Sequence, residues 1–185
     1  MTKRAGREFL VEVATLLRQP GSRREVVLDG LIEDLAISTS RVPEGALLHL
    51  EVVLEAVFEG ILVSGSIDTS WEGTCRRCLE VASGPLHAEV RELYVASPDE
   101  EETTYPLGRG ELDLSLLAHD ACILELPLAP LCREDCRGLC PYCGANRNRE
   151  PCSCEPAPSG PFAALALLWA DGDVTGEAGR KDRDD

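Results

Sequence analysis

Residues 131–154 read LCREDCRGLCPYCGANRNREPCSC and contain six of the nine cysteines in the chain. Within this stretch, the segment CPYCG at 140–144 has the form of a zinc knuckle, in which two cysteines bind one ion from the two sides of a tight turn. The proline sets the turn and the glycine lets the backbone reverse direction. Thiolates are soft ligands, and zinc binds four of them in tetrahedral geometry. The stretch therefore predicts a metal-binding module.

Six cysteines do not divide into sites of four, and the missing pair lies upstream in the segment CRRC at 75–78. The eight cysteines favour two all-thiolate zinc sites, with Cys122 left over. One site would consist of Cys75, Cys78, Cys132 and Cys136, and the other of Cys140, Cys143, Cys152 and Cys154. The first would join distant segments, and the second would be a local knuckle. A single ion with spare thiols remains the alternative, because spacing limits the pairings without deciding them.

The composition limits the kind of partner that the chain can bind. Its 185 residues suit one domain with an appendage, and with 4% aromatic residues any core must be aliphatic. The net charge of −15 argues against a large phosphate-binding face, because Lys and Arg supply the affinity for a nucleic-acid backbone. Residues 25–130 carry five basic and twenty-one acidic side chains. This acidic middle suits a basic partner, although acidic surfaces also serve solubility alone.

The sequence predicts a cytoplasmic protein. The first residues are basic, but Glu8 and Glu12 interrupt any apolar signal segment, and no run of eighteen apolar residues is present to span a membrane. Reduced thiols in the cytoplasm favour metal binding over disulfides. GxSxG, HExxH and P-loop motifs are absent, so the sequence gives no support for a hydrolase, a zinc protease or a nucleotide-binding protein. We expect no small-molecule substrate.

Hydrophobic periodicity predicts an α+β fold: an antiparallel β-rich domain with one or two helices and a C-terminal cysteine-rich zinc-binding module. Apolar residues alternate with more polar ones from 46 to 58, ending at Phe58, and Glu59-Gly60 predicts a hairpin turn into a return strand that runs toward Cys75. Shorter strands are expected at 9–13, 25–28 and 86–95. From residue 112 the period changes, which predicts a helix to about 124 with Leu112, Leu116 and Leu117 on its apolar face.

The predicted organisation has four parts. Residues 1–130 form the β-rich domain, which includes the knuckle of Cys75 and Cys78, and residues 131–155 form the cysteine-rich zinc module. Residues 156–170 carry a short C-terminal helix, and residues 171–185 form a disordered tail rich in glycine and charge. The acidic run 99–102 is expected in an exposed loop.

Three motifs together resemble the bacterial YceD family, which also occurs in plastids. They are CRRC at 75–78, LPLAPLC at 126–132 and CREDCRGLCPYCGAN at 132–146, within a similarity that covers residues 8–170. Cys75 and Cys78 match the family's first cysteine pair, and Cys132 and Cys136 match the next two positions. Some relatives lack the later set from Cys140 to Cys154, which agrees with a separate second site.

The resemblance implies a role in accumulation of the large-subunit ribosomal RNA and in assembly of that subunit, with no catalytic activity. In many bacteria the gene of the family neighbours that of a small, basic ribosomal protein of the large subunit. The implied partner is therefore a ribosomal protein or the pre-ribosomal large subunit, with weak or indirect contact to ribosomal RNA and none to a membrane.

Two other functions stay open from the residues alone. The first is a thiol-based redox protein or sensor that uses Cys75 and Cys78, with Arg76 and Arg77 favouring thiolate. A redox CxxC, however, begins a helix in a βαβ unit, whereas this one follows a predicted hairpin. The second is a nucleic-acid-binding ribbon, for which Tyr142 is the single aromatic in the module. Its positive charge would come from Arg133, Arg137, Arg147 and Arg149, enough for weak, salt-sensitive binding.

Overall fold

The computed structural model describes residues 7–98 and 104–154, which form mostly β-sheet with one α-helix. Its elements in chain order are the 3-10 helix η1 (Arg7–Phe9), β1 (Leu10–Glu12), the 3-10 helix η2 (Leu16–Arg18), β2 (Arg23–Gly30), β3 (Ser40–Arg41), β4 (Leu48–Ala56), β5 (Gly60–Thr74), β6 (Val81–Val95), β7 (Tyr105–Pro106), β8 (Glu111–Asp113) and α1 (Ser115–Glu125). The predicted hairpin at residues 46–71 is thereby confirmed as β4 and β5.

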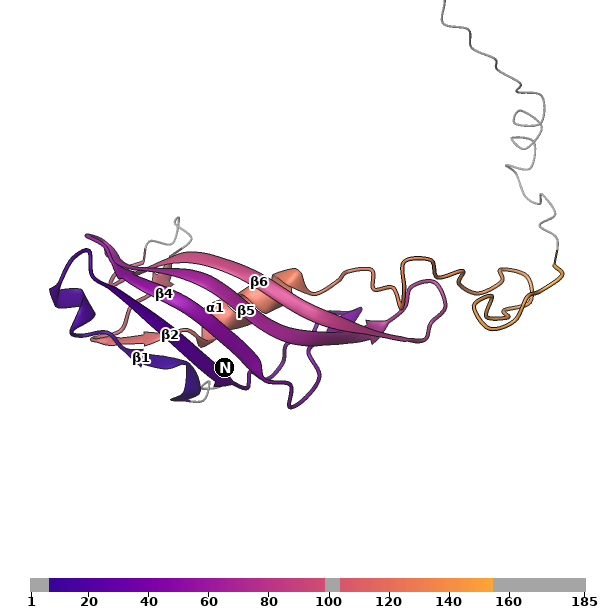
Figure 1. Cartoon of the computed structure of the whole chain (residues 1–185), viewed down its shortest axis with the longest axis horizontal. Helices are drawn as coiled ribbons and strands as arrows, with labels where there is room; N and C mark the ends of the chain where they lie inside the picture. The colour runs from indigo at the N-terminus through magenta and orange to yellow at the C-terminus, as the bar shows by residue number, and fades with distance from the viewer. Residues whose placement is uncertain (1–6, 99–103, 155–185) are drawn as a thin grey trace, which may run out of the picture. The chain divides into compact units, whose positions relative to one another are not determined.

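The main sheet is built on one long antiparallel hairpin. β5 and β6 have fifteen residues each and pair along their whole length, from Gly60 opposite Val95 to Thr74 opposite Val81. The sheet order is β2-β4-β5-β6-β7, and β3 pairs with the last part of β5. Among the strands of residues 7–98 and 104–154, only the two-residue β7 pairs in parallel, alongside β6. Figure 1 shows the four long strands β2, β4, β5 and β6 side by side.

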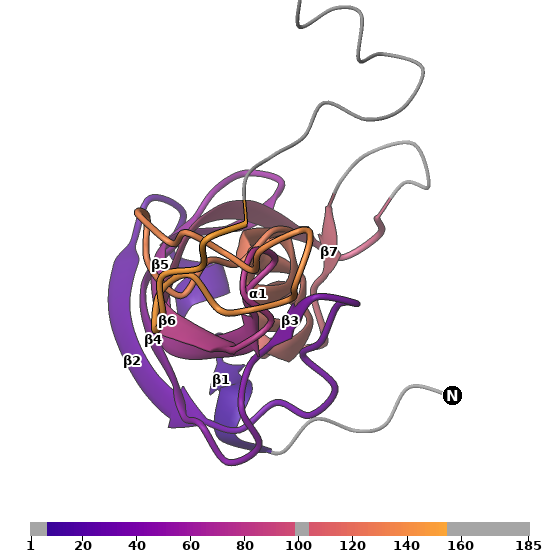
Figure 2. The same cartoon turned by 90° about the vertical axis from the view of Figure 1, so that its right-hand side faces the viewer.

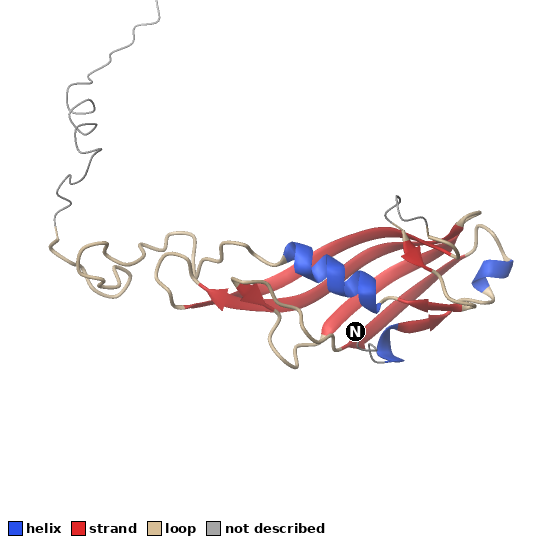
Figure 3. Cartoon of the chain, turned by 180° about the vertical axis from the view of Figure 1, so that it is seen from behind, coloured by secondary structure: helices blue, strands red, loops and turns tan. Residues whose placement is uncertain are grey.

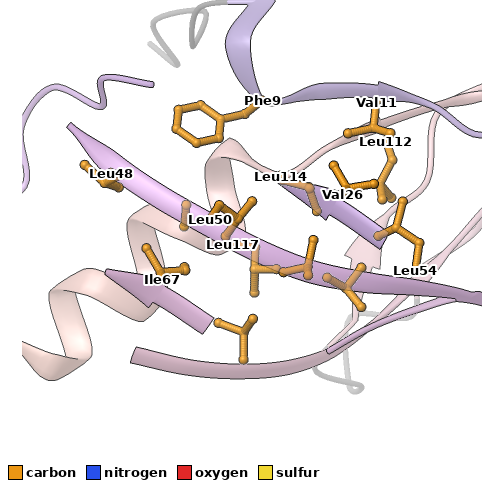
Figure 4. Packing of buried hydrophobic residues seen from close by; sticks show 14 of the residues in the cluster. Phe9, Val11, Val26, Leu48, Leu50, Leu54, Ile67, Leu112, Leu114 and Leu117 are labelled. Atoms are coloured by element: carbon orange, nitrogen blue, oxygen red, sulfur yellow. The ribbon is translucent and has the colours of Figure 1, made fainter. Parts of the chain in front are cut away.

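One face of this sheet, the inner face, carries the core. Helix α1 packs on β5 and β6 from this side, as Figure 3 shows from behind, and Figure 2 shows the strands curving around it. The alternate residues of β4 point into the core, as their periodicity predicts. These are Leu48, Leu50, Val52, Leu54 and Ala56, several of which Figure 4 shows packed with Phe9 and Leu117. Phe58, predicted on the same face, is fully exposed because the strand ends at Ala56.

A second, two-stranded sheet covers another side of the core. β1 pairs with β8, so that Val11 lies opposite Leu112, and both side chains are buried. The prediction that Leu112 belongs to the helix is therefore wrong. Apolar spacing alone favoured the helix, whereas pairing with β1 gives Leu112 both backbone partners and burial.

The helix begins at Ser115, whose N–H donates to the Asp113 carboxylate at 2.9 Å. An acidic side chain at this end meets the positive end of the helix dipole. Leu117 and Ala118 face the core, but Leu116, also predicted on the apolar face, is 47% exposed. No helix in the described part of the chain is long and apolar enough to cross a bilayer.

The chain divides into two compact units, Met1–Leu139 and Cys140–Asp185. Cys132 and Cys136, which the sequence grouped with the module at 131–155, lie in the first unit, because they meet cysteines that follow β5. The helix expected within 156–170, the tail 171–185 and the acidic run 99–102 lie outside the described residues.

Candidate metal centres

Four thiols from two distant segments meet where β5 ends. Two come from the turn between β5 and β6, and two from the loop that follows α1. The Sγ atoms of Cys75 and Cys136 are 3.8 Å apart, and those of Cys78 and Cys132 are 3.6 Å apart. All four Sγ atoms lie within 4.8 Å of one another. A tetrahedral site with Zn–S bonds of about 2.3 Å has edges of roughly 3.8 Å, so this group could hold a metal ion.

Arg77 joins the two segments of this group. Its guanidinium donates hydrogen bonds to the carbonyl oxygens of Glu134 at 3.1 Å and Cys136 at 3.0 Å. The neighbouring Arg76 N–H donates to the carbonyl of Pro130 at 3.0 Å. The sequence interpreted both arginines as charges that favour thiolate. The contacts make Arg77 a positioning residue for the loop, a role that only the folded loop reveals.

The second group lies in the second unit and is more open. It consists of Cys140, Cys143, Cys152 and Cys154, whose Sγ atoms also lie within 4.8 Å of one another, and Cys140 is its one buried member. Asn146 closes the loop between the two cysteine pairs: its side-chain oxygen accepts from the Asn148 N–H at 3.0 Å. The sequence reasoning did not single out Asn146, although an asparagine two residues before another polar residue is a signal for such a turn.

The two groups are the sets of four that the spacing favoured, and neither includes a histidine. All nine cysteines are free of disulfides. Cys122 lies apart from both groups in the hydrophobic core, where burial raises the pKa of its thiol to about 11 and keeps it protonated at neutral pH. That these eight cysteines bind metal stays a prediction.

The two knuckles have the same backbone hydrogen bonds. In each, the N–H of the first cysteine donates to the carbonyl five residues later, from Cys75 to Glu80 and from Cys140 to Ala145, both at 2.8 Å. The N–H of the fifth residue donates back to the carbonyl of the first cysteine, at 2.9 Å in both knuckles. This tight turn brings the two thiols of a CxxC pair to the same side. The first CRRC segment thus has knuckle geometry without the proline and glycine that marked the second.

The fifth position of each knuckle has a left-handed backbone. Gly144 has φ 74° and Leu79 has φ 62°. Glycine adopts this conformation freely, whereas a residue with a Cβ atom does so at a cost of about 1–2 kcal/mol. Leu79 is 66% exposed, so burial of its side chain offsets little of that cost. The first knuckle is therefore strained at Leu79.

The first cysteine of each knuckle ionises most easily. Burial raises the pKa of Cys75, but the backbone N–H groups that donate to its sulfur, led by that of Cys132, lower it to about 6. The N–H groups of Cys143 and Tyr142 likewise lower the pKa of Cys140 to about 6. Backbone N–H groups thus stabilise one thiolate in each group, which is the form that binds metal, and in the first group the leading donor comes from the loop that follows α1.

Cys132 and Cys154, from the later pair of each group, resist ionisation. Burial, followed by the nearby thiol of Cys136, raises the pKa of Cys132 to about 12. The neighbouring thiol of Cys143, followed by burial, raises the pKa of Cys154 to about 12. Four thiolates this close repel one another, so full ionisation of either group needs a cation between the sulfur atoms.

Comparison with known proteins places the chain in a family. The family model described as "Large ribosomal RNA subunit accumulation protein YceD" matches residues 63–169, a range that contains β6, α1 and both knuckles. The chain belongs to the YceD family. The resemblance drawn from the cysteine motifs is thereby confirmed, and the family is linked to accumulation of the large ribosomal RNA subunit.

Several relatives of this YceD family member are similar along most of its length. An uncharacterized protein of Mycobacterium tuberculosis is 38% identical over 155 residues, which cover 76% of this chain and 72% of that protein. An uncharacterized protein of Mycobacterium leprae is 31% identical over 150 residues, 76% of this chain and 68% of that protein. A maize protein named "Large ribosomal RNA subunit accumulation protein YCED homolog 1, chloroplastic" is 40% identical over 53 residues, 28% of this chain and 18% of that protein. No solved structure matches the chain.

We predict that Leu79→Gly stabilises the first unit, although most substitutions destabilise. Relief of the left-handed strain should return about 1–2 kcal/mol, and the greater freedom of glycine in the unfolded chain should cost about 0.4–1 kcal/mol. The net gain, about 0.5–1 kcal/mol, is measured as the free energy of unfolding in denaturant. Gly144→Leu is the matched substitution in the second knuckle and should weaken metal binding there. A loss of stability in Leu79→Gly would show that this side chain contributes more than its exposure indicates.

We predict that the two groups fail independently, because they lie in different compact units. Cys75→Ser should lose one metal ion and destabilise the sheet of the first unit by more than about 3 kcal/mol. Cys140→Ser should lose the other ion and leave unfolding of the sheet unchanged. Metal analysis and circular dichroism during thermal unfolding measure both effects, and Cys122→Ala serves as a cysteine variant outside both groups. Loss of both ions from either serine variant would contradict the two-site assignment.

Proposed function

We propose that this YceD family member is a non-enzymatic, zinc-stabilised factor that supports accumulation of the large-subunit ribosomal RNA and thereby assembly of that subunit. The observation that carries the proposal is the pair of four-cysteine groups, whose sulfur spacings of 3.6 and 3.8 Å in the first group fit tetrahedral zinc. When four protein ligands fill the coordination shell, no open position remains for a substrate or an activated water. Zinc would therefore be structural here.

The zinc ions would make rigid the cysteine-containing loops, which do not pack in the hydrophobic core. Structural zinc contributes roughly 10–16 kcal/mol in zinc-finger peptides, as much as the whole stability of an ordinary domain at about 5–15 kcal/mol. The loop 131–139 contains no helix or strand, and Leu131 is the residue through which it packs against the first cysteine group. A metal ion would hold this loop against the end of the hairpin and give a partner a fixed surface to recognise.

The partner that we propose is a basic ribosomal protein or the pre-ribosomal large subunit in the cytoplasm. The acidic composition of residues 25–130 supports a basic protein, and the family supports a ribosomal one. Contact with ribosomal RNA would be weak or indirect, because three acidic side chains in residues 131–154 offset most of the positive charge of the four arginines in the same stretch.

We predict two zinc ions per chain in protein purified without added metal, as measured by elemental analysis. Zinc binding to the metal-free protein should release at least about two protons per ion at neutral pH, because the raised pKa values of Cys78 and Cys132, and of Cys152 and Cys154, keep these thiols protonated without metal. Affinity should therefore fall as the pH is lowered. Calorimetry in buffers of different ionisation enthalpy counts the protons. Metal-free protein that cycles between dithiol and disulfide at Cys75 and Cys78 would support the redox alternative instead.

The cellular role is tested by deleting the gene in the organism that encodes it. We expect the ratio of large-subunit to small-subunit ribosomal RNA to fall, and the wild-type gene on a plasmid to restore it. The variant Cys75→Ser should restore it poorly, and Cys122→Ala should restore it fully. An unchanged ratio in the deletion strain would refute the proposed function, whatever the metal content of the protein.

A further inference from the structure

The main sheet has an outer face, opposite the core, that the described part of the chain leaves open to solvent. Figure 1 views this face, with α1 behind the strands. Because side chains alternate along a strand, the residues between the buried ones of β2, β4, β5 and β6 point outward. Most of these outward residues are exposed or half-buried, in contrast to the inner face.

This outer face is acidic. It carries seven carboxylates and three guanidinium groups from β2 to β6: Glu25, Asp29, Glu51, Glu55, Asp68, Glu72 and Glu89, against Arg23, Arg41 and Arg91. Two of the arginines are already paired, Arg23 with Glu55 at 3.1 Å and Arg41 with Glu72 at 2.7 Å. The remaining carboxylates therefore outnumber the remaining guanidinium group, and the face presents excess negative charge to solvent.

Two histidines hold three of these carboxylates in place. His49 contacts Asp29 at 2.7 Å with one ring nitrogen and Glu51 at 3.1 Å with the other, and His87 contacts Asp68 at 2.7 Å. The hydrogen bond to the Asp29 carboxylate, then that to Glu51, raises the pKa of His49, and the bond to Asp68 raises the pKa of His87. The row across β2, β4, β5 and β6 consists of Asp29, His49, Asp68 and His87, whose backbone positions are paired in register.

A hollow of about 590 Å³ lies at the centre of this face. Its floor is the Ser64-Gly65-Ser66 segment of β5, and its walls include Glu89 and Arg91 of β6. Position 65 must be glycine, because a Cβ atom there would overlap the carbonyl oxygen of Glu51 on β4. Because these three residues in succession are small, no side chain from the floor fills the hollow.

Ser66, on the floor of the hollow, lies between glutamates on the two neighbouring strands. Ser66 is paired with Glu51 of β4 on one side and with Glu89 of β6 on the other. Strands are about 4.8 Å apart, so the two glutamates stand roughly 10 Å from each other across the serine. The hydroxyl groups of Ser64 and Ser66 have no hydrogen-bond partner within residues 7–98 and 104–154, and each can accept a hydrogen bond from a ligand. This arrangement suits a guanidinium or ammonium group that enters from solvent.

We propose that the outer face of the sheet is the docking surface for an arginine- or lysine-rich protein segment, with one cationic side chain seated over Ser66 between Glu51 and Glu89. The inference deepens the proposed function, since it names where on this chain the basic partner binds. Charge complementarity selects this occupant. Phosphates of RNA would be repelled by the same carboxylates, and a second copy would bring an equally acidic face to a two-fold contact.

The test uses the full chain and a fluorescein-labelled peptide of alternating arginine and alanine, with a glutamate-alanine peptide as the charge control. Fluorescence anisotropy gives the Kd. Glu51→Gln combined with Glu89→Gln should weaken binding of the arginine peptide about fivefold or more, since each exposed charge contact is worth up to about 1 kcal/mol. Glu44→Gln combined with Glu111→Gln removes the same charge outside the outer face, from exposed positions, and should change the Kd less than about twofold.

A second pair of variants separates the hollow from charge alone. Ser66→Leu fills the hollow and keeps every charge, and it should weaken the arginine peptide to a similar extent. Ser70→Leu adds the same side chain farther along β5 on the same face and should have little effect. Amide chemical shifts of Ser64 to Ser66 should change on titration with the peptide.

Several results would overturn the inference. The double variant Glu51→Gln, Glu89→Gln is called the outer-face variant. If it and the control variant Glu44→Gln, Glu111→Gln weakened peptide binding equally, overall charge and not this face would attract the peptide. An RNA oligonucleotide that binds the wild type and not the outer-face variant would assign the surface to nucleic acid. A dimer in sedimentation that the outer-face variant converts to monomer would assign it to a second copy. An outer-face variant that restores ribosomal RNA in the deletion strain and binds peptide normally would refute this inference alone, leaving the proposed function intact.

Discussion

Four thiols within 4.8 Å of one another cannot all be thiolates unless a cation lies between them, and this constraint shapes the first unit. Two of the thiols follow β5 and the other two follow α1, so one ion would join the longest hairpin to the segment that leaves the helix. The carbonyl of Pro127 on that segment already accepts hydrogen bonds from the hydroxyls of Thr39 and Ser40. The cluster would thus complete a path of contacts that keeps α1 on the inner face of the sheet.

The two knuckles have the same backbone conformation but different residues in the turn. Their backbone hydrogen bonds have the same lengths, and both place a left-handed residue directly after the second cysteine. The second knuckle has glycine there and belongs to a unit of its own. The first has Leu79 and is joined to the sheet domain through β5, β6 and Arg77. The strain at Leu79 is tolerated because the surrounding strands and hydrogen bonds determine the turn, and strained residues of this kind concentrate at functional surfaces.

The inner face of the sheet contributes to stability, and the outer face is the one that we propose for recognition. The inner face buries an almost wholly aliphatic core, which explains how a chain with few aromatic residues folds. The outer face carries the acidic excess, partly compensated by two arginines and two histidines, around a hollow of small residues. This separation lets a strongly acidic chain keep a compact core, because its charges stay in water and repel one another weakly there. A member of the YceD family would then offer a rigid, negatively charged surface to the basic proteins of the ribosome.

The sequence by itself identified the eight cysteines, the β4–β5 hairpin and the family, because spacing and alternation are local properties that can be recognised without knowledge of contacts. It favoured the division into two groups of four without deciding it. It failed where a residue's state depends on a distant partner. The sequence predicts that Leu112 is helical, but β1 pairs with it, and that Phe58 lies on the core face, but the strand ends before it. The boundary predicted at residue 131 separated Cys132 and Cys136 from the unit that contains them, although the sequence grouped their thiols with those of Cys75 and Cys78. Arg77 gained its role from two carbonyl groups that the fold brings to it. Tertiary structure alone decided these features, since the free energy of pairing and burial outweighs local preference wherever the two disagree.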